Sequence, residues 1–210
     1  MSLKVDFAEL APSPAEFLGR IAYLHLALSR LFSDAAALNS ALSHQQALAE
    51  STAHSIGVNA VAVGELRRLG IDAEAAEAEY RERTDAFIAT VRGQRPLEAM
   101  VTAYVVVGFL RDFSLALASG MRSDTGARLE AALSRTDEED RLRDLLFAAI
   151  AEEPAQAHLL ALWGRRLVGD TLLFAHDVLA LDGVGEHVEP VFTELIAVHT
   201  RRMDALGLTA

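Results

Sequence analysis

The stretch AMVTAYVVVGFL, Ala99–Leu110, is the longest apolar run of the chain; it is interrupted at Thr102 and stops at the charged pair Arg111-Asp112. Its apolar residues would point to all sides of a helix, which is typical of a helix near the centre of a bundle. A membrane-spanning helix needs about 20 apolar residues. The run therefore predicts a buried core helix.

The composition favours helices over strands. Hydrophobic residues make up 51% of the 210 residues, and only 5 prolines are present, which suits helices. Aromatic residues make up 6%, which gives an all-β fold no support. A chain of this length can bury a full core, and no linker or low-complexity tract divides it. We expect a single all-α domain over residues 1–210.

Charge and cysteine content exclude several classes of function. The formal net charge is −11, and such an acidic surface repels nucleic-acid phosphates and anionic membranes, although one local basic patch could still bind RNA. The absence of cysteine excludes disulfides, thiolate metal sites and thiol catalysis. The N-terminal stretch MSLKVDFAELAPSP lacks the features of a secretory signal. These observations predict a soluble, cytoplasmic protein that does not bind membranes.

The first half of the chain predicts four helices. Ser13 is expected to cap the first helix, with Pro14 at its first position. Gly57 and Gly64, inside the second helix, indicate a close approach of a neighbouring helix. The expected helices run from Pro14 to Ser33-Asp34, from about Ala35 to Leu69, from Asp72 to about Val91, and from Pro96 to Gly120.

The second half predicts further helices. Residues 124–151 read as helical with a break near residues 134–137, and Pro154 begins a helix that carries Trp163 and Leu167. The loop 182–185 leads to the last helix, which Gly207 ends as its C-cap. One apolar stripe is expected along that helix, formed by Val188, Phe192, Leu195, His199, Met203 and Leu206.

Two segments of the last third carry a family resemblance. They are LWGRRLVGD at Leu162–Asp170 and HTRRMDALGL at His199–Leu208, and weaker matches are FLGRIAY, ELRRLGID and MVTAYV. These segments resemble an actinobacterial ferritin-like family related to the tRNA hydroxylase MiaE. The resemblance implies a ferritin-like antiparallel helical bundle with additional C-terminal helices. It also implies, for MiaE-like members, hydroxylation of a modified tRNA base by activated oxygen.

The metal motifs of such bundles are missing. Ferritin-like di-iron sites use a Glu from each of two helices and a Glu-x-x-His from each of the other two, but no Glu-x-x-His occurs anywhere in this chain. An Arg at a ligand position repels a cation. We therefore expect no working di-iron centre and no cofactor. The residues that the resemblance aligns with the ligand positions are His25, the pair Ser55 and Val58, the position Val107, and the pair Arg135 and Glu138.

A rebuilt metal site is the alternative. Glu50 and His54 are four residues apart, hence on one helical face, and two His with one carboxylate can hold a single iron. The more ordinary interpretation of each residue is a structural hydrogen bond. The candidate ligands under this alternative are His25, Glu50, His54, Asp112 and Glu138. The protein would then be an oxygen-dependent non-haem iron hydroxylase that modifies tRNA.

Two arginine pairs lie in the segments that resemble the family. The spacing of Arg166 and Asp170 predicts an ion pair on one face of a helix. A second interpretation has Arg165 or Arg166 face RNA phosphate together with Arg201-Arg202. His199 lies in the apolar stripe of its helix, so we expect it to pack between helices with one internal hydrogen bond.

The sequence favours a binding role and leaves enzymatic activity open. The partner could be another protein, a small molecule in the vacated core, or a second copy of the chain in a homodimer. Iron storage would need a ferroxidase centre and a cage, and no residue pattern points to either. The sequence specifies neither the substrate nor the partner.

Overall fold

The computed structural model describes residues 13–121, 123–135, 137–181 and 189–208. No strand occurs within these ranges, so the predicted all-α class is confirmed. The helices are α2 (Pro14–Leu38), α3 (Leu42–Arg68), α4 (Ala73–Ala78), α5 (Arg81–Val91), α6 (Pro96–Gly120), α7 (Asp124–Leu133), α8 (Asp137–Glu152), α9 (Pro154–Leu181) and α10 (Glu189–Ala205).

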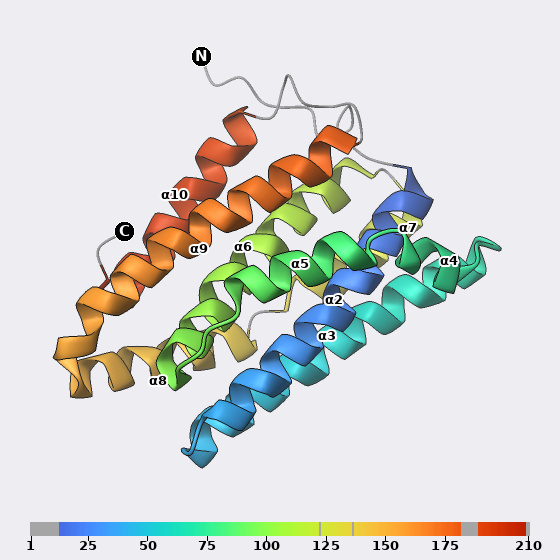
Figure 1. Cartoon of the computed structure of the whole chain (residues 1–210). Coiled ribbons are helices and arrows are strands. Elements are labelled where there is room, and N and C mark those ends of the chain that lie inside the picture. The colour runs from blue at the N-terminus through green and yellow to red at the C-terminus, as the bar shows by residue number, and fades with distance from the viewer. Residues whose placement is uncertain (1–12, 122, 136, 182–188, 209–210) are drawn as a thin grey trace.

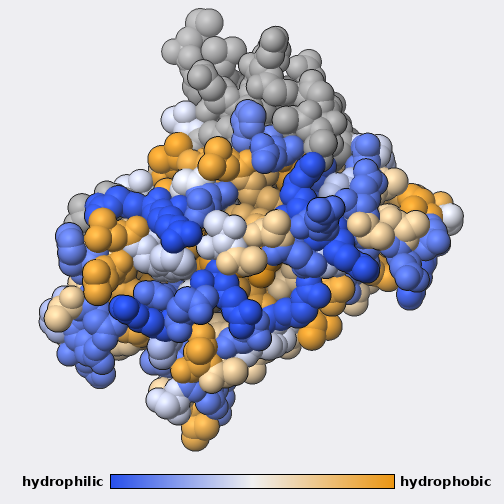
Figure 2. Space-filling model, viewed as in Figure 1, coloured by the Kyte–Doolittle hydropathy of each residue, from blue (hydrophilic) through white to orange (hydrophobic). Residues whose placement is uncertain are grey.

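Helix α6 lies at the centre, as its all-round apolar sequence predicts. It contacts α2, α7, α8, α9 and α10, while α2 and α3 form a long antiparallel pair on one side (Figure 1). By length and composition α6 could span a membrane, yet 72% of its most apolar window is buried inside the protein. Helix α6 is therefore the core helix of the bundle. On the face drawn in Figure 2, hydrophilic residues surround smaller apolar patches.

The predicted helix ends at Ser13, Gly70 and Gly207 are confirmed. The backbone N–H of Glu16 donates to Ser13 Oγ (3.3 Å), and the Ser13 N–H donates to the Glu16 carboxylate (3.0 Å), so a capping box begins α2 with Pro14 in its first turn. Gly70 and Gly207 have φ of 74° and 70°. These left-handed conformations suit glycine at helix C-termini.

The boundary predicted at Ser33-Asp34 is wrong. Ser33 Oγ donates to the Ser29 carbonyl (2.9 Å), so its hydroxyl is satisfied inside the helix and α2 continues to Leu38. The chain turns instead at Asn39, whose Nδ2 donates to the Ala35 carbonyl (2.8 Å). Gln45 Nε2, from the first turn of α3, donates to the Asn39 carbonyl (2.7 Å). The turn therefore depends on Asn39.

The helix predicted from Asp72 to Val91 is also divided. Asp72 caps α4 as expected, but α4 ends at Ala78 and α5 begins at Arg81. Tyr80 between them is buried, and the Arg20 guanidinium of α2 lies 5.4 Å from its ring centre. The break therefore lets an aromatic ring turn into the bundle where a continuous helix would not. By contrast, the break predicted near residues 134–137 is confirmed.

A buried ion cluster fixes α7 against α3. Arg128 Nε donates to Glu65 Oε1 (2.8 Å), and the Thr125 hydroxyl donates to Glu65 Oε2 (2.9 Å). Hydrogen bonds from Arg68, then from Arg128 and Thr125, outweigh the effect of burial and lower the pKa of Glu65 to about 2. This cluster holds the start of the α7–α8 segment beside α3.

The stripe of the last helix is confirmed where the structure describes it. Leu195, His199, Met203 and Leu206 are all buried. The loop residues 182–185, Val188 and the side chain of Phe192 lie outside the described residues. On α9, Leu167 is buried and Trp163 is partly buried, while Leu159 and Leu173 are 52% and 66% exposed.

The close helix approach predicted at Gly57 and Gly64 is wrong, because a Cβ at either position would have no atom within 4 Å. The tight contact lies elsewhere, between α2 and α4. A Cβ at Gly19 would lie 2.6 Å from the carbonyl oxygen of Ala76.

This contrast predicts opposite effects for two substitutions of the same kind. Gly64→Ala should stabilise the protein by roughly 0.5–1 kcal/mol, because alanine is the better helix former at an open position. Gly19→Ala should destabilise it by about 1–3 kcal/mol, because a backbone carbonyl has to move. Urea unfolding followed by circular dichroism measures both, and a Gly19→Ala protein as stable as wild type would contradict the helix contact.

Candidate functional site

Four helices direct side chains at one internal cavity of about 30 Å³. Each buried water needs roughly 10–15 Å³ of such space, so the cavity can hold only one or two waters. Its lining includes His25 from α2, Ser51, His54 and Ser55 from α3, Val107, Gly108 and Arg111 from α6, and Glu138, Glu139 and Leu142 from α8.

Two of the helices each present a pair of side chains to the cavity three residues apart. Helix α3 presents Ser51 and His54 to it, and α8 presents Glu139 and Leu142, both with the i,i+3 spacing of Glu-x-x-His. The alignment on sequence had put Ser55 and Val58 at the first pair, one helical turn further on. Val58 does not line the cavity.

Beside the cavity, two arginines and two carboxylates form a closed ring of ion pairs, called the charge ring below. Arg202 Nε contacts Glu139 Oε1 (3.0 Å), and its Nη2 contacts Asp112 Oδ2 (2.8 Å). Arg111 closes the ring through Asp112 Oδ1 (3.2 Å) and through the second oxygen of Glu139. The ring connects α6, α8 and α10.

Arg202 reaches this position because α6 carries glycine opposite it. A Cβ at Gly108 would lie 2.5 Å from Arg202 Nε. Only 8% of the Arg202 side chain is exposed. Burial disfavours its charge, but Glu139 and Asp112 outweigh burial and raise the pKa of Arg202. The guanidinium therefore stays positive inside the bundle.

The five candidate ligands do not converge on one point. His25, His54 and Glu138 line the cavity, and His54 Nδ1 lies 3.4 Å from Glu138 Oε1. Glu50 instead pairs with Arg141 on the outside of the bundle, and Asp112 belongs to the charge ring. Among the residues that the structure describes, no group of three or more His, Asp or Glu is arranged to hold a metal.

The two cavity histidines are neutral at pH 7. Burial, and then the neighbouring His54, lower the pKa of His25 to about 3, and the buried Nδ1 of His25 has no hydrogen-bond partner. Burial also lowers the pKa of His54; Glu138 opposes this shift, and Arg135 and Arg111 add to it. Both imidazoles therefore keep free lone pairs, as a metal ligand or a hydrogen-bond acceptor must.

These residues do not fit a pair of iron ions. A di-iron centre needs several carboxylates to neutralise its charge in a low-dielectric core. Asp112 and Glu139 are already neutralised by Arg111 and Arg202, which leaves Glu138 as the one carboxylate of the cavity outside the charge ring. Arg111 also lines the cavity itself and would repel a cation there.

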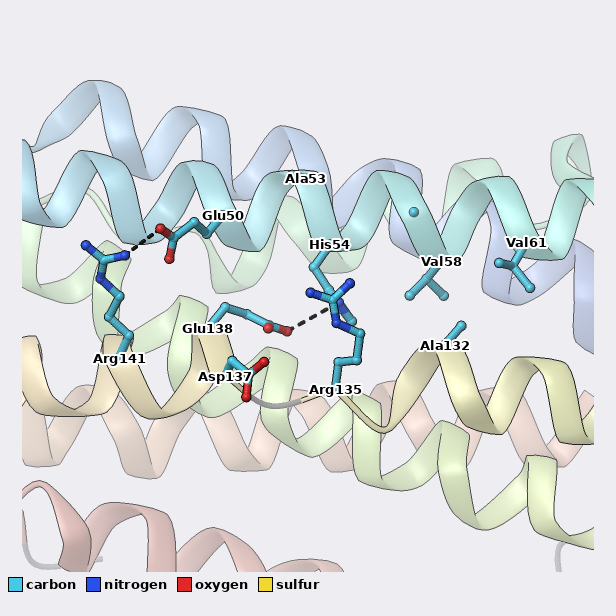
Figure 3. A pocket seen from close by; sticks show the side chains of 11 residues that line it. Glu50, Ala53, His54, Val58, Val61, Ala132, Arg135, Asp137, Glu138 and Arg141 are labelled. Carbon is cyan, nitrogen blue, oxygen red and sulfur yellow. Dashed lines mark hydrogen bonds and ion pairs between the residues drawn. The ribbon is translucent and has the colours of Figure 1, made fainter.

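A larger groove lies outside the cavity, between α3 and the junction of α7 with α8. Its volume is about 720 Å³, and His54 and Glu138 line both spaces. Figure 3 shows this pair bridging α3 and α8, with Arg135 extending from below toward His54. The His54–Glu138 pair thus forms the wall between groove and cavity.

Among the arginines in the two segments that resemble the family, Arg166 is exposed and Arg202 is buried. Arg166 Nε pairs with Asp170 Oδ2 (3.4 Å), as predicted, and its guanidinium lies 5.3 Å from the centre of the Trp163 ring. Trp163 Nε1 donates to Thr102 Oγ1 (3.0 Å) on α6. Arg202, which the second interpretation placed on an RNA-facing patch, pairs instead with Asp112 and Glu139 in the charge ring, so the full set of arginines in that patch does not form.

The helices form an all-α bundle around this polar cavity. Residues 11–186 match the family model described as a ferritin-like domain of actinomycetes, and the chain belongs to this family. A comparison with curated proteins finds no match. The matched range ends before α10, so Arg202 enters the charge ring from a helix beyond it.

The charge ring predicts unequal roles for two adjacent arginines. Arg202→Met should lower the free energy of unfolding by about 2 kcal/mol, because the partly buried Glu139 and Asp112 would lose one of their two arginine partners. Arg201→Met should change it by less than about 0.5 kcal/mol, since Arg201 is 63% exposed and lies 3.4 Å from Glu194. Urea unfolding of both variants measures the difference, and equal effects would contradict a structural ring.

His199 predicts how stability depends on pH. Both ring nitrogens are buried without a hydrogen-bond partner, contrary to the one internal bond expected, and burial and then Arg202 lower its pKa to about 4. The unfolded histidine titrates near pH 6.5. The contribution to stability is therefore complete above about pH 6.5 and is lost as the pH falls toward 4.

Replacing His199 measures its own contribution to the pH dependence of stability. His199→Leu should reduce the slope of unfolding free energy against pH by up to about 1.4 kcal/mol per unit between pH 6 and 4.5. Urea titrations at several pH values measure this slope, and carboxylates that also lose their partners in acid affect both proteins equally. An unchanged slope would show that His199 titrates normally in the folded state.

Proposed function

We propose that this protein is a ferritin-like bundle that works without a di-iron centre, and that its role is to bind a partner or small molecule. The charge ring is the observation that supports this proposal. Two guanidinium groups supply, in fixed covalent form, the positive charge that metal ions supply in a di-iron bundle. Their partners Glu139 and Asp112 lie at 2.8–3.0 Å from Arg202, so the carboxylates are no longer available as ligands.

The energetics of buried charge support the same proposal. A buried ion pair is costly to desolvate, and removing one member leaves an uncompensated charge. Metal binding at Glu139 or Asp112 would have to displace Arg111 or Arg202, which have little access to water, at 14% and 8% exposure. A bundle that keeps its carboxylates paired in this way is stable without a cofactor.

The alternative remains a MiaE-like, oxygen-dependent non-haem iron hydroxylase that acts on tRNA. It is supported by the placement of His25, His54 and Glu138, two neutral imidazoles and a carboxylate, around one cavity. A single iron bound there would supply oxygen activation, and these three residues would hold it. The net charge of −11 and the burial of Arg202 weigh against a tRNA substrate.

The predicted cytoplasmic location and homodimer belong to this proposal as well. A bundle that buries its most apolar helix, α6, is suited to an aqueous compartment. The exposed leucines of α9, Leu159, Leu162 and Leu173, are apolar surface that a second copy could cover. The identity of the partner stays open.

Metal content distinguishes the two functions. Protein purified without a His tag or chelator, then incubated with ferrous iron without oxygen, is measured by plasma mass spectrometry. We expect close to no iron per chain before and after loading. About one iron that is lost in His25→Leu and His54→Leu variants would favour the mononuclear hydroxylase. About two per chain would overturn the proposed function.

A further inference from the structure

The groove between α3 and the α7–α8 junction has the size of a small-molecule site. Its volume of about 720 Å³ lies within the range of roughly 300–1,000 Å³ that ligand sites occupy. The internal cavity, at about 30 Å³, is too small for an organic ligand. If this protein binds a small molecule, the groove is therefore the better place for it.

The side chains of α3 make the groove mostly apolar. Val61 of α3 and Ala132 of α7 face each other across it, as Figure 3 shows. Gly57 also lines the groove and is exposed on α3, where a Cβ would meet no atom within 4 Å. The absence of a side chain at Gly57 keeps this part of the groove open.

One pair of opposite charges in the groove is neutralised. Glu50 pairs with Arg141 at one end, and Glu138 lies 3.4 Å from His54 at the wall of the cavity. Arg135 is different: within the part of the chain that the structure describes, no hydrogen bond or ion pair involves its guanidinium. The Arg135 guanidinium lies beside the His54–Glu138 pair, as Figure 3 shows, and its positive charge helps to lower the pKa of His54.

We propose that the groove binds a small amphipathic carboxylate, an organic acid with an alkyl or aryl body. The carboxylate would accept hydrogen bonds from the Arg135 guanidinium, whose planar fork matches a carboxylate. The apolar body would lie along Gly57, Val61 and Ala132. The inference rests on the proposed binding role and names the ligand class for it.

The other charges of the groove limit the charge of the ligand. The groove is lined by the carboxylates of Glu50, Asp137 and Glu138 against the guanidinium groups of Arg135 and Arg141. With three negative groups and two positive ones the lining is net negative, so a phosphate dianion would be repelled more strongly than a single carboxylate, whose charge Arg135 alone can balance. Asp137 is at the first turn of α8, where the helix dipole stabilises its negative charge.

Calorimetric titration with sodium octanoate and with 1-octanol tests the proposal, because the two probes share their apolar body and differ in charge. We expect saturable binding of octanoate to the wild type and binding of octanol weaker by about tenfold or more. Arg135→Gln should weaken octanoate by a similar factor. Arg83→Gln, at an exposed arginine of α5, should leave it unchanged.

A second pair of variants tests the apolar part. Gly57→Leu should fill the groove and abolish octanoate binding without loss of stability, since leucine is a better helix former than glycine. Gly64→Leu is its control, because Gly64 is also exposed on α3 but does not line the groove. Thermal unfolding confirms that each variant is folded.

Three outcomes would overturn the inference: no octanoate binding by the wild type, equal affinity for octanol, or unchanged affinity in both Arg135→Gln and Gly57→Leu. Failure here is distinct from failure of the proposed function, which metal content decides. A metal-free protein that ignores octanoate loses only the ligand class. A protein that holds two irons loses the proposed function whatever the groove binds.

Discussion

The charge ring is the constraint on which the centre of this bundle depends. Two guanidinium groups and two carboxylates meet with little access to water, and each carboxylate contacts both arginines. Because an unpaired charge is so costly in the interior, α6, α8 and α10 must keep their relative positions. Gly108 is part of the same constraint, since a side chain there would occupy the space of Arg202.

The charge ring also determines which charged groups remain unpaired in the cavity beside it. It pairs Glu139, which lines the cavity, and Asp112, which does not, with two arginines, and the cavity is small and also bordered by His25 and His54. His54 and Glu138 separate this interior from the groove outside. The larger of the two spaces, about 720 Å³ against about 30 Å³, therefore lies at the surface between α3 and the α7–α8 junction.

Local sequence signals predicted most of the helices but not all their boundaries. Caps and breakers such as Ser13, Pro96 and Gly207 act through their nearest neighbours, so their effects are readable from the sequence. The end of α2 was misplaced because Ser33 can satisfy its hydroxyl within the helix as well as cap the next one. At the division between α4 and α5, Tyr80 is buried beneath Arg20, a residue 60 positions away, and no local pattern predicts that contact.

The sequence by itself determined the helical class, the central place of Ala99–Leu110 and the absence of Glu-x-x-His, because each depends on composition or short spacing. It also placed His25, His54 and Glu138 among the residues of interest, and the structure brings these three to one cavity. Only the tertiary structure decided what surrounds them. Asp112 meets Arg202 across 90 residues of chain, and Glu50 meets Arg141, so two expected ligands became ion-pair partners. Pairing between distant charges depends on helix packing, which local patterns do not encode.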